Sequence, residues 1–272
     1  MQQPNATIGS ILGNAPLIND DDPRVNAGWQ YLAATLERIG PRAADPDGFP
    51  VQAGSSLARD DQLTTPYQVS HSVQQSIVAG IDHLDAIKHL VIGQGVLNLA
   101  ATWTLARGAI ENLAVAYWLL TGSRQERVER TLRVHAKNSY DQYVATKHMD
   151  EQSALTAKVG QHAHIKAIAE RNGIDDSDRL NGFTATSVLE WTSDRTGGNA
   201  LFAWRLCSGF AHGRSWAYLG ALERRENASN REPGVVNATL TNSVASALTP
   251  ILLATNLAVE VVDLFDKRAQ PV

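Results

Sequence analysis

The stretch LFAWRLCSGFAHGRSW, residues 201–216, carries most of what this chain reveals about itself. It is apolar nearly throughout and predicts one continuous core helix, yet it contains Arg205 and His212. Seven positions of an α-helix turn through about 700°, so these two side chains share one face and lie about 10 Å apart along the axis. Ionisable groups on an apolar helix are paired, neutralised or functional. Arg205 and His212 are therefore the first candidates for a functional site.

Three neighbours in the same stretch add to this candidate site. Gly209 and Gly213 each cost about 1 kcal/mol inside a helix relative to alanine, which indicates close approach of a backbone or ligand. Ser208 precedes His212 by four residues. Its hydroxyl could serve as a nucleophile with His212 as base, or simply bond to its own helix. Cys207 points elsewhere and is predicted to be a small buried side chain.

A second polar pair lies in ARGAIENLAVAYW, residues 106–118. Arg107 and Glu111 are four residues apart, so they share a helix face. Arg before Glu is the less favourable order on a surface helix, and the surroundings are apolar, so surface decoration is disfavoured. Two readings remain open and are compatible. The pair is a buried ion pair that fixes helix register, or it supports the candidate site together with Asn112.

The rest of the chain also predicts helices, because apolar residues recur at three- and four-residue steps. The predicted helices cover residues 24–39, 69–92, 98–120, 124–149, 152–171 and 242–267. Two short segments, residues 218–224 and 235–241, flank a turn-rich stretch and predict a β-hairpin before the last helix. The expected fold class is all-α, a multi-helix bundle with one short β-hairpin.

The domain organisation follows from where this periodicity is absent. Residues 1–22 are polar and predict a flexible N-terminal arm, followed by a peripheral helix over residues 23–39. Residues 40–68 are rich in Pro, Gly and Asp and show no periodicity, so they predict a long loop. The helical bundle domain is expected over residues 69–268. The arginines of residues 124–133 alternate with glutamates, which favours a packed or solvated helix face over a nucleic-acid groove.

Composition limits the classes of function. The 272 residues are 43% hydrophobic and carry a net charge of −4, with a pI near 6.1. Such a protein does not attract polyanions as a whole, so an RNA partner needs a local basic surface. The single cysteine excludes an internal disulfide, and the eight histidines lack chelating spacing, so neither a metal nor a cofactor is predicted. The long apolar stretches carry internal charges or many polar residues, which favours core helices of a cytoplasmic protein without a membrane partner.

The motif Arg205-x6-His212, inside a late helix of an all-α bundle, resembles the HEPN superfamily, in which an Arg is followed by four to six residues and a His. The Arg107-x3-Glu111 pattern, combined with SGFAHG at residues 208–213, is also similar to bacterial helical proteins regarded as HEPN relatives. The resemblance covers about residues 69–268.

The resemblance implies metal-independent RNA cleavage, of the kind found in toxins, phage defence or stress responses. Arg205 would bind the scissile phosphate, and His212 would act as general acid or base. It also implies a homodimer, because sites of this superfamily often form where helices of two protomers meet, and an antitoxin or other protein partner. Leu206 departs from the pattern, since active members often carry a polar residue there. The alternative is a non-enzymatic helical protein that binds a small anionic ligand or a protein partner, with these Arg, Glu and His residues structural.

Overall fold

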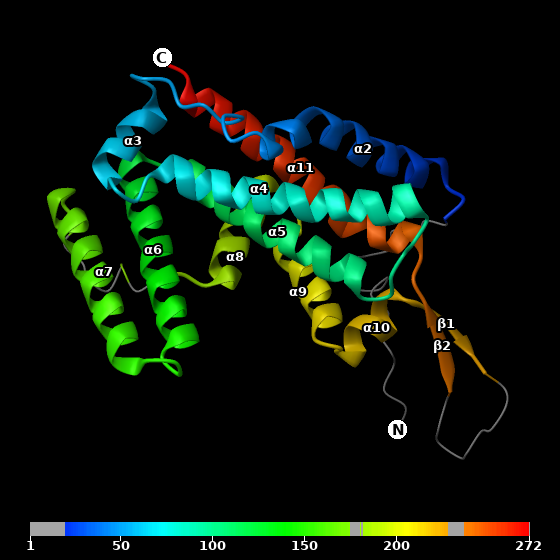
Figure 1. Ribbon diagram of the computed structural model, residues 1–272. Coiled ribbons are helices and arrows are strands. Elements are labelled where there is room, and N and C mark those ends of the chain that lie inside the picture. Colours follow the sequence, from blue (N-terminus) through cyan, green and yellow to red (C-terminus); the bar gives the residue numbers. More distant parts are fainter. Residues whose placement is uncertain (1–19, 175–179, 181, 228–236, 272) are drawn as a thin grey trace.

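The computed structural model describes residues 20–174, 180, 182–227 and 237–271 and shows an all-α, multi-helix bundle with one short β-hairpin (Figure 1). The helices are α2 (Pro23–Ala44), α3 (Ser56–Thr64), α4 (Val69–Lys88), which continues as the π-helical turn η1 (His89–Gly93), α5 (Ala101–Leu120), α6 (Arg124–Thr146), α7 (Glu151–Arg171), α8 (Ala185–Thr196), α9 (Ala200–Ala211), α10 (Ser215–Ala221) and α11 (Val244–Ala269). Strands β1 (Glu223–Glu226) and β2 (Ala238–Thr241) pair antiparallel between α10 and α11. The predicted fold class is confirmed.

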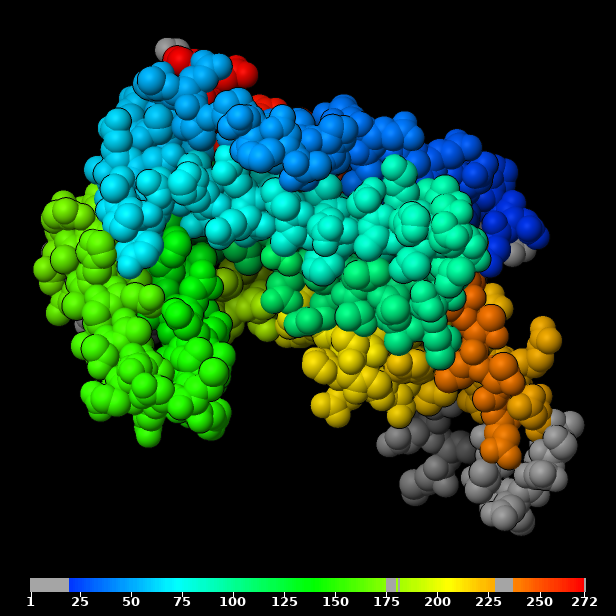
Figure 2. Space-filling model, viewed as in Figure 1, coloured from blue at the N-terminus to red at the C-terminus, as the bar shows by residue number. Residues whose placement is uncertain are grey.

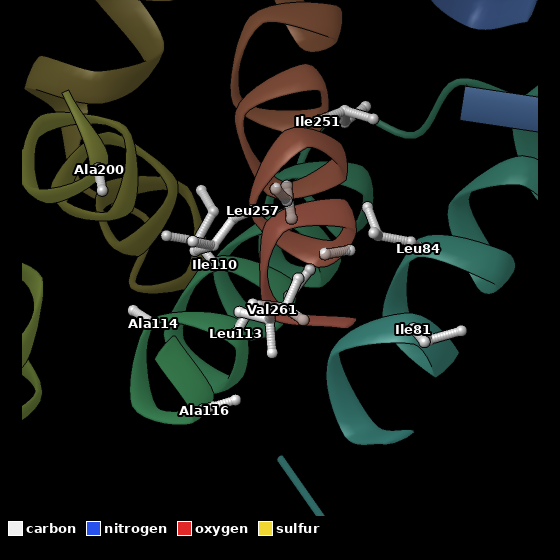
Figure 3. Packing of buried hydrophobic residues seen from close by; sticks show 14 of the residues in the cluster. Ile81, Leu84, Ile110, Leu113, Ala114, Ala116, Ala200, Ile251, Leu257 and Val261 are labelled. Carbon is white, nitrogen blue, oxygen red and sulfur yellow. The ribbon is translucent and has the colours of Figure 1, made fainter. Parts of the chain in front are cut away.

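Helices α5 and α11 form the centre of the core. Each is apolar around most of its circumference, and such a helix must be covered on most sides. Helices α4, α8, α9 and α11 all pack on α5. Figure 3 shows the middle of this core, with labelled side chains that include Leu84, Ile110, Leu113, Leu257 and Val261.

Among the described helices, α11 alone is long and apolar enough to cross a membrane by length and composition. In the structure, 56% of its most apolar stretch is buried inside the protein. A central core helix has the same composition as a membrane span, so length and composition alone are weak evidence.

The structure corrects the prediction that residues 40–68 form one long loop. Helix α2 continues through Pro41 to Ala44, and α3 fills the middle of the loop region. Pro41 lies in the last turn of α2, where its missing N–H removes only one helical hydrogen bond. The end of this helix is held by Arg42, which donates to both carboxylate oxygens of Asp266 at 2.8 and 2.7 Å. The sequence pattern missed this extension because the stabilising partner lies 224 residues away.

Helix α3 has two anchors. The Ser55 hydroxyl accepts a hydrogen bond from the N–H of Ala58 at 3.1 Å and caps the helix. Asp60 is fully buried and accepts a hydrogen bond from Arg127 Nε of α6 at 2.7 Å. The cap is local, whereas the ion pair with Arg127 is a tertiary contact that the sequence of α3 does not display.

The predicted N-terminal arm lies mostly outside the described residues. Its last part, Asp20 to Asp22, is ordered against the bundle. Asp22 caps α2 by accepting from the N–H of Arg24, and Asp20 accepts from the N–H of Ala245 at the start of α11. These bonds place the beginning of the first described helix beside the beginning of the last.

Helices α6 and α7 form a hairpin that projects from the bundle, and the surface is hollowed between this hairpin and α9 (Figure 2). In the arginine-rich part of α6, Arg127 and Arg130 pack inward, which agrees with the predicted packed helix face and not with a nucleic-acid groove. Arg127 is 4% exposed and Arg130 is 7% exposed. Arg130 donates to the carbonyl oxygens of Trp118 and Thr121, so it fixes the start of α6 against the end of α5.

Candidate functional site

The helix predicted over residues 201–216 is broken in two by a tight turn. Helix α9 ends at Ala211, and Gly213 takes a positive φ of 62°. The N–H of Arg214 donates to the carbonyl of Gly209 at 2.8 Å, and the N–H of Gly213 donates to that of Phe210 at 3.1 Å. This is the Schellman pattern of a helix C-terminus. Gly213 therefore marks a helix end and not a close approach.

The close approach expected at Gly209 is confirmed, and the approaching group is another helix of the same chain. A Cβ at Gly209 would lie 2.6 Å from the Cβ of Ala217 and 3.0 Å from the ring of Trp216. Both belong to α10, which folds back on the end of α9. The two glycines therefore shape the α9–α10 corner that presents His212.

Arg205 and His212 both lie on the outer surface of α9. The Arg205 side chain is 56% exposed, and its guanidinium is 4.0 Å from a carboxylate oxygen of Glu190. His212 is exposed. Its backbone N–H donates to the carbonyl of Ser208 at 3.0 Å, so the main chain of His212 continues the helical hydrogen bonding of α9. Within the described residues no contact joins the two side chains, so the structure neither seals them in the core nor brings them together.

A separate polar network joins α5 to α9, and we call it the α5–α9 seam: Arg107, Glu111, Trp204 and Ser208. Arg107 Nε donates to Ser208 Oγ at 2.9 Å, and its terminal nitrogen lies 3.1 Å from Glu111 Oε2. The indole N–H of Trp204 donates to the same Glu111 oxygen at 2.8 Å. The Arg107 guanidinium carbon also lies 5.3 Å from the centre of the Trp204 ring.

The seam corrects the expectation of a buried ion pair. The side chains of Arg107 and Glu111 are 31% and 33% exposed, so solvent reaches the pair. The seam also excludes Arg205 and His212, which the sequence grouped with it. Ser208 accepts its hydrogen bond from Arg107, and among the described residues no bond links it to the His212 ring. The Ser208 nucleophile reading gains no support from this geometry.

Asn112, the remaining predicted residue, does not reach the seam. Its amide nitrogen donates to the carbonyl of Gly108 on the same helix at 2.9 Å. His83 of α4 lies against the same glycine, since a Cβ on Gly108 would clash with the His83 imidazole ring. The sequence does not predict this contact between His83 and Gly108, because it depends on how closely α4 packs on α5.

Trp204 was also missed, although the sequence holds a signal for it. It precedes Ser208 by four residues, and the same spacing that pairs Ser208 with His212 puts Trp204 on the same side of α9. Cys207 is buried as predicted, and burial raises the pKa of its thiol to about 12. A thiol with that pKa is not a nucleophile near neutral pH.

The chemistry available on α9 is therefore an exposed guanidinium and an exposed imidazole on a helix that the seam holds against α5. A guanidinium offers paired donors to phosphate oxygens, and an imidazole transfers protons near neutral pH. No family model, no curated protein and no solved structure matches this chain. The interpretation of the site consequently depends on its own residues and geometry.

Proposed function

We propose that this protein is a HEPN-like, metal-independent endoribonuclease that uses Arg205 and His212. The observation that carries the proposal is the exposure of both side chains on the outer surface of α9, at the spacing of the Arg-x6-His motif. A core histidine and arginine with purely structural roles would be buried and bonded. These two are accessible to a substrate.

The reaction needs only proton transfer and charge stabilisation. The 2′-oxygen of a ribose attacks the adjacent phosphorus, and the bond from phosphorus to the 5′-oxygen of the next nucleotide breaks. A base takes the proton from the 2′-hydroxyl, and an acid protonates the departing 5′-oxygen. The products are a 2′,3′-cyclic phosphate and a 5′-hydroxyl. His212 serves as the base or the acid, and Arg205 binds the non-bridging oxygens as negative charge builds up.

The spacing within one chain supports a site shared by two copies. Arg205 and His212 are separated by about 10 Å along the α9 axis, whereas a catalytic base must come within about 3.2 Å of its proton. The Arg205 and His212 of one α9 helix are therefore too far apart for one to contact the phosphate while the other contacts the reacting hydroxyl. Two α9 helices that meet around a two-fold axis set the Arg205 of one copy beside the His212 of the other.

The test is cleavage of a fluorescent single-stranded RNA by the purified full-length chain in EDTA. We expect cleavage products that end in 2′,3′-cyclic phosphate. His212→Ala is expected to slow the reaction at least about a hundredfold, which is the usual contribution of general acid–base catalysis. Arg38→Ala and His148→Ala replace exposed residues elsewhere and serve as controls. No cleavage by the unmodified chain, or unchanged cleavage by His212→Ala, would refute the proposal.

A second candidate is a non-enzymatic protein that binds a small anion through Arg205. It is favoured by Leu206, which is 7% exposed and packs into the core where active relatives often carry a polar residue. The thermal shift that inorganic phosphate produces separates the two candidates. A shift that Arg205→Ala removes and His212→Ala retains, without RNA cleavage, supports the binding protein.

A further inference from the structure

The outer half of the α6–α7 hairpin, residues 139–163, buries almost nothing of its own. Every residue in this range is described, and only Ser139 and Ala154 are buried. The inner half differs, because it holds a small core. That core contains Val128, Leu132, Ala136, Ile165, Ile168, Ala169, Ile174 and Leu180. The outer half projects into solvent beyond this core (Figure 1).

Five large apolar side chains of this outer half are exposed; Met149 lies in the turn between the helices, and the other four lie on the helices themselves. Tyr140 and Val144 of α6 are 51% and 39% exposed, and Leu155 and Val159 of α7 are 40% and 59% exposed. Within each helix the two residues are four apart and share a stripe. Isolated exposed apolar residues are ordinary, whereas a contiguous group indicates an interaction surface.

The two stripes lie on the same side of the hairpin. Each stripe is rotated by roughly a quarter to a third of a turn from the residues that pack between the helices, in the same sense along each chain. Because the two helices run antiparallel, equal rotations bring both stripes to one side. Lys158 lies opposite Tyr140 and Tyr143, with its ammonium 5.3 and 4.9 Å from their rings, and this register sets Leu155 near Val144. We call the surface formed by Tyr140, Val144, Leu155, Val159, Lys147 and Lys158 the hairpin face.

The charges on the hairpin face determine which partner fits. Lys158 lies over two tyrosine rings, and Lys147 lies over Tyr143 at 5.9 Å. Neither ammonium is within ion-pair distance of a carboxylate among the described residues. These two ammonium groups outnumber the one carboxylate on the same stripe, that of the exposed Glu151 four residues before Leu155, so the face suits a surface that is both apolar and acidic.

We propose that the hairpin face docks an acidic amphipathic helix of a partner protein. A third helix laid along α6 and α7 would cover Val144 and Leu155 with its apolar stripe and present carboxylates to Lys147 and Lys158. A second copy of the hairpin fits less well, because the same ammonium groups would face one another. RNA fits less well too, because the other apolar side chains of the face are aliphatic and the one exposed ring, Tyr140, already faces the ammonium groups of Lys137 and Lys158 at 5.8 and 5.3 Å. The proposal uses no residue of α9 and is independent of the proposed ribonuclease activity.

The test is fluorescence anisotropy of a labelled helical peptide whose apolar residues recur every three or four positions and whose other face carries glutamates. The full-length protein is titrated into this peptide and into a matched peptide with lysines in place of the glutamates. We expect the acidic peptide to bind and the basic peptide not to bind. Lys158→Glu should weaken binding about tenfold, and Val144→Glu should weaken it at least as much, as expected for a central contact.

The matched control is Leu63→Glu on α3, because Leu63 is 39% exposed, as is Val144. This variant should bind the acidic peptide like the unmodified chain, and circular dichroism verifies that all variants keep their helix content. Three results overturn the proposal. They are no binding of the acidic peptide, equal loss with Leu63→Glu, and self-association by sedimentation that Val144→Glu abolishes. Displacement of the peptide by single-stranded RNA would reassign the face to nucleic acid.

Discussion

Replacing Asp60 should lower the free energy of unfolding strongly, even when the new side chain has nearly the same shape. It is fully buried on α3, and its Oδ2 accepts from Arg127 Nε at 2.7 Å. Its Oδ1 is 3.5 Å from Arg124 Nε. Arg268 of α11 is also near, since burial and Arg127 lower the pKa of Arg268 and the charge of Asp60 opposes them. One carboxylate therefore forms ion pairs with two arginines of α6 and also attracts the charge of Arg268 on α11.

Asp60→Asn keeps the size of the side chain and one acceptor for Arg127, but removes the negative charge. Arg127 is only 4% exposed, so water cannot replace the lost carboxylate. Breaking a buried ion pair by removing one partner costs about 3–5 kcal/mol. That is a large share of a total stability of about 5–15 kcal/mol. Added salt should not restore the loss, because buried charges are screened weakly.

The assay is urea unfolding monitored by circular dichroism, and the free energies of unfolding of the variants are compared at one urea concentration. Two further Asp→Asn replacements calibrate it. Asp61→Asn perturbs the acceptor of Ser70, whose N–H and hydroxyl donate to Asp61 at 2.9 and 2.7 Å, and should cost about 1 kcal/mol. Asp82→Asn changes an exposed carboxylate and should cost almost nothing. A loss below about 1 kcal/mol for Asp60→Asn would show that this cluster is not what holds α3 in place.

Further measurements test other parts of the structure. Gly80→Ala should destabilise by about 1–3 kcal/mol, because the new Cβ would lie 2.5 Å from Leu113 Cγ, whereas Gly160→Ala has open space and should stabilise by about 0.5–1 kcal/mol; urea unfolding measures both. Burial lowers the pKa of His135 from its usual 6.5, so the unfolded chain binds more protons in mildly acidic solution. Stability should therefore fall as the pH drops below about 6.5, and the slope of melting temperature against pH should flatten in His135→Gln. Cys207, with its pKa raised to about 12 by burial, should react with iodoacetamide at pH 8 only when urea unfolds the chain, as mass spectrometry would show.

The helices with long apolar stripes could be predicted from the sequence, because their burial is written in residue spacing. Val73, Ile77 and Ile81 of α4 are examples, and all three are buried. Helix α3 was not predicted, because Asp60 resembles a loop residue until Arg127 is placed beside it. The extension of α2 past Pro41 was not predicted for the same reason, since the partner of Arg42 is the distant Asp266. Long-range ion pairs leave no periodic signal.

The arrangement of the candidate residues could be predicted only in part. Arg107 and Glu111 pair as their spacing suggested, whereas the contact of Arg107 with Ser208 was not predicted, because it depends on how α5 packs on α9. The break after Ala211 was misread, although the sequence His212-Gly213 has the form of a helix end. The roles of Arg205 and His212 stay predictions until RNA cleavage is measured.

The contact between the two ends of the described chain has a consequence for how this protein is made. Helix α2 packs on α11, with Arg42 bonded to Asp266 and Asp20 bonded to the N–H of Ala245. During synthesis α2 leaves the ribosome more than two hundred residues before its partner, and the faces of α4 and α5 that α11 covers stay open meanwhile. The nascent chain must therefore wait with an incomplete core until its last helix emerges. A stop codon that removes α11 should leave a product that chaperones retain and proteases degrade.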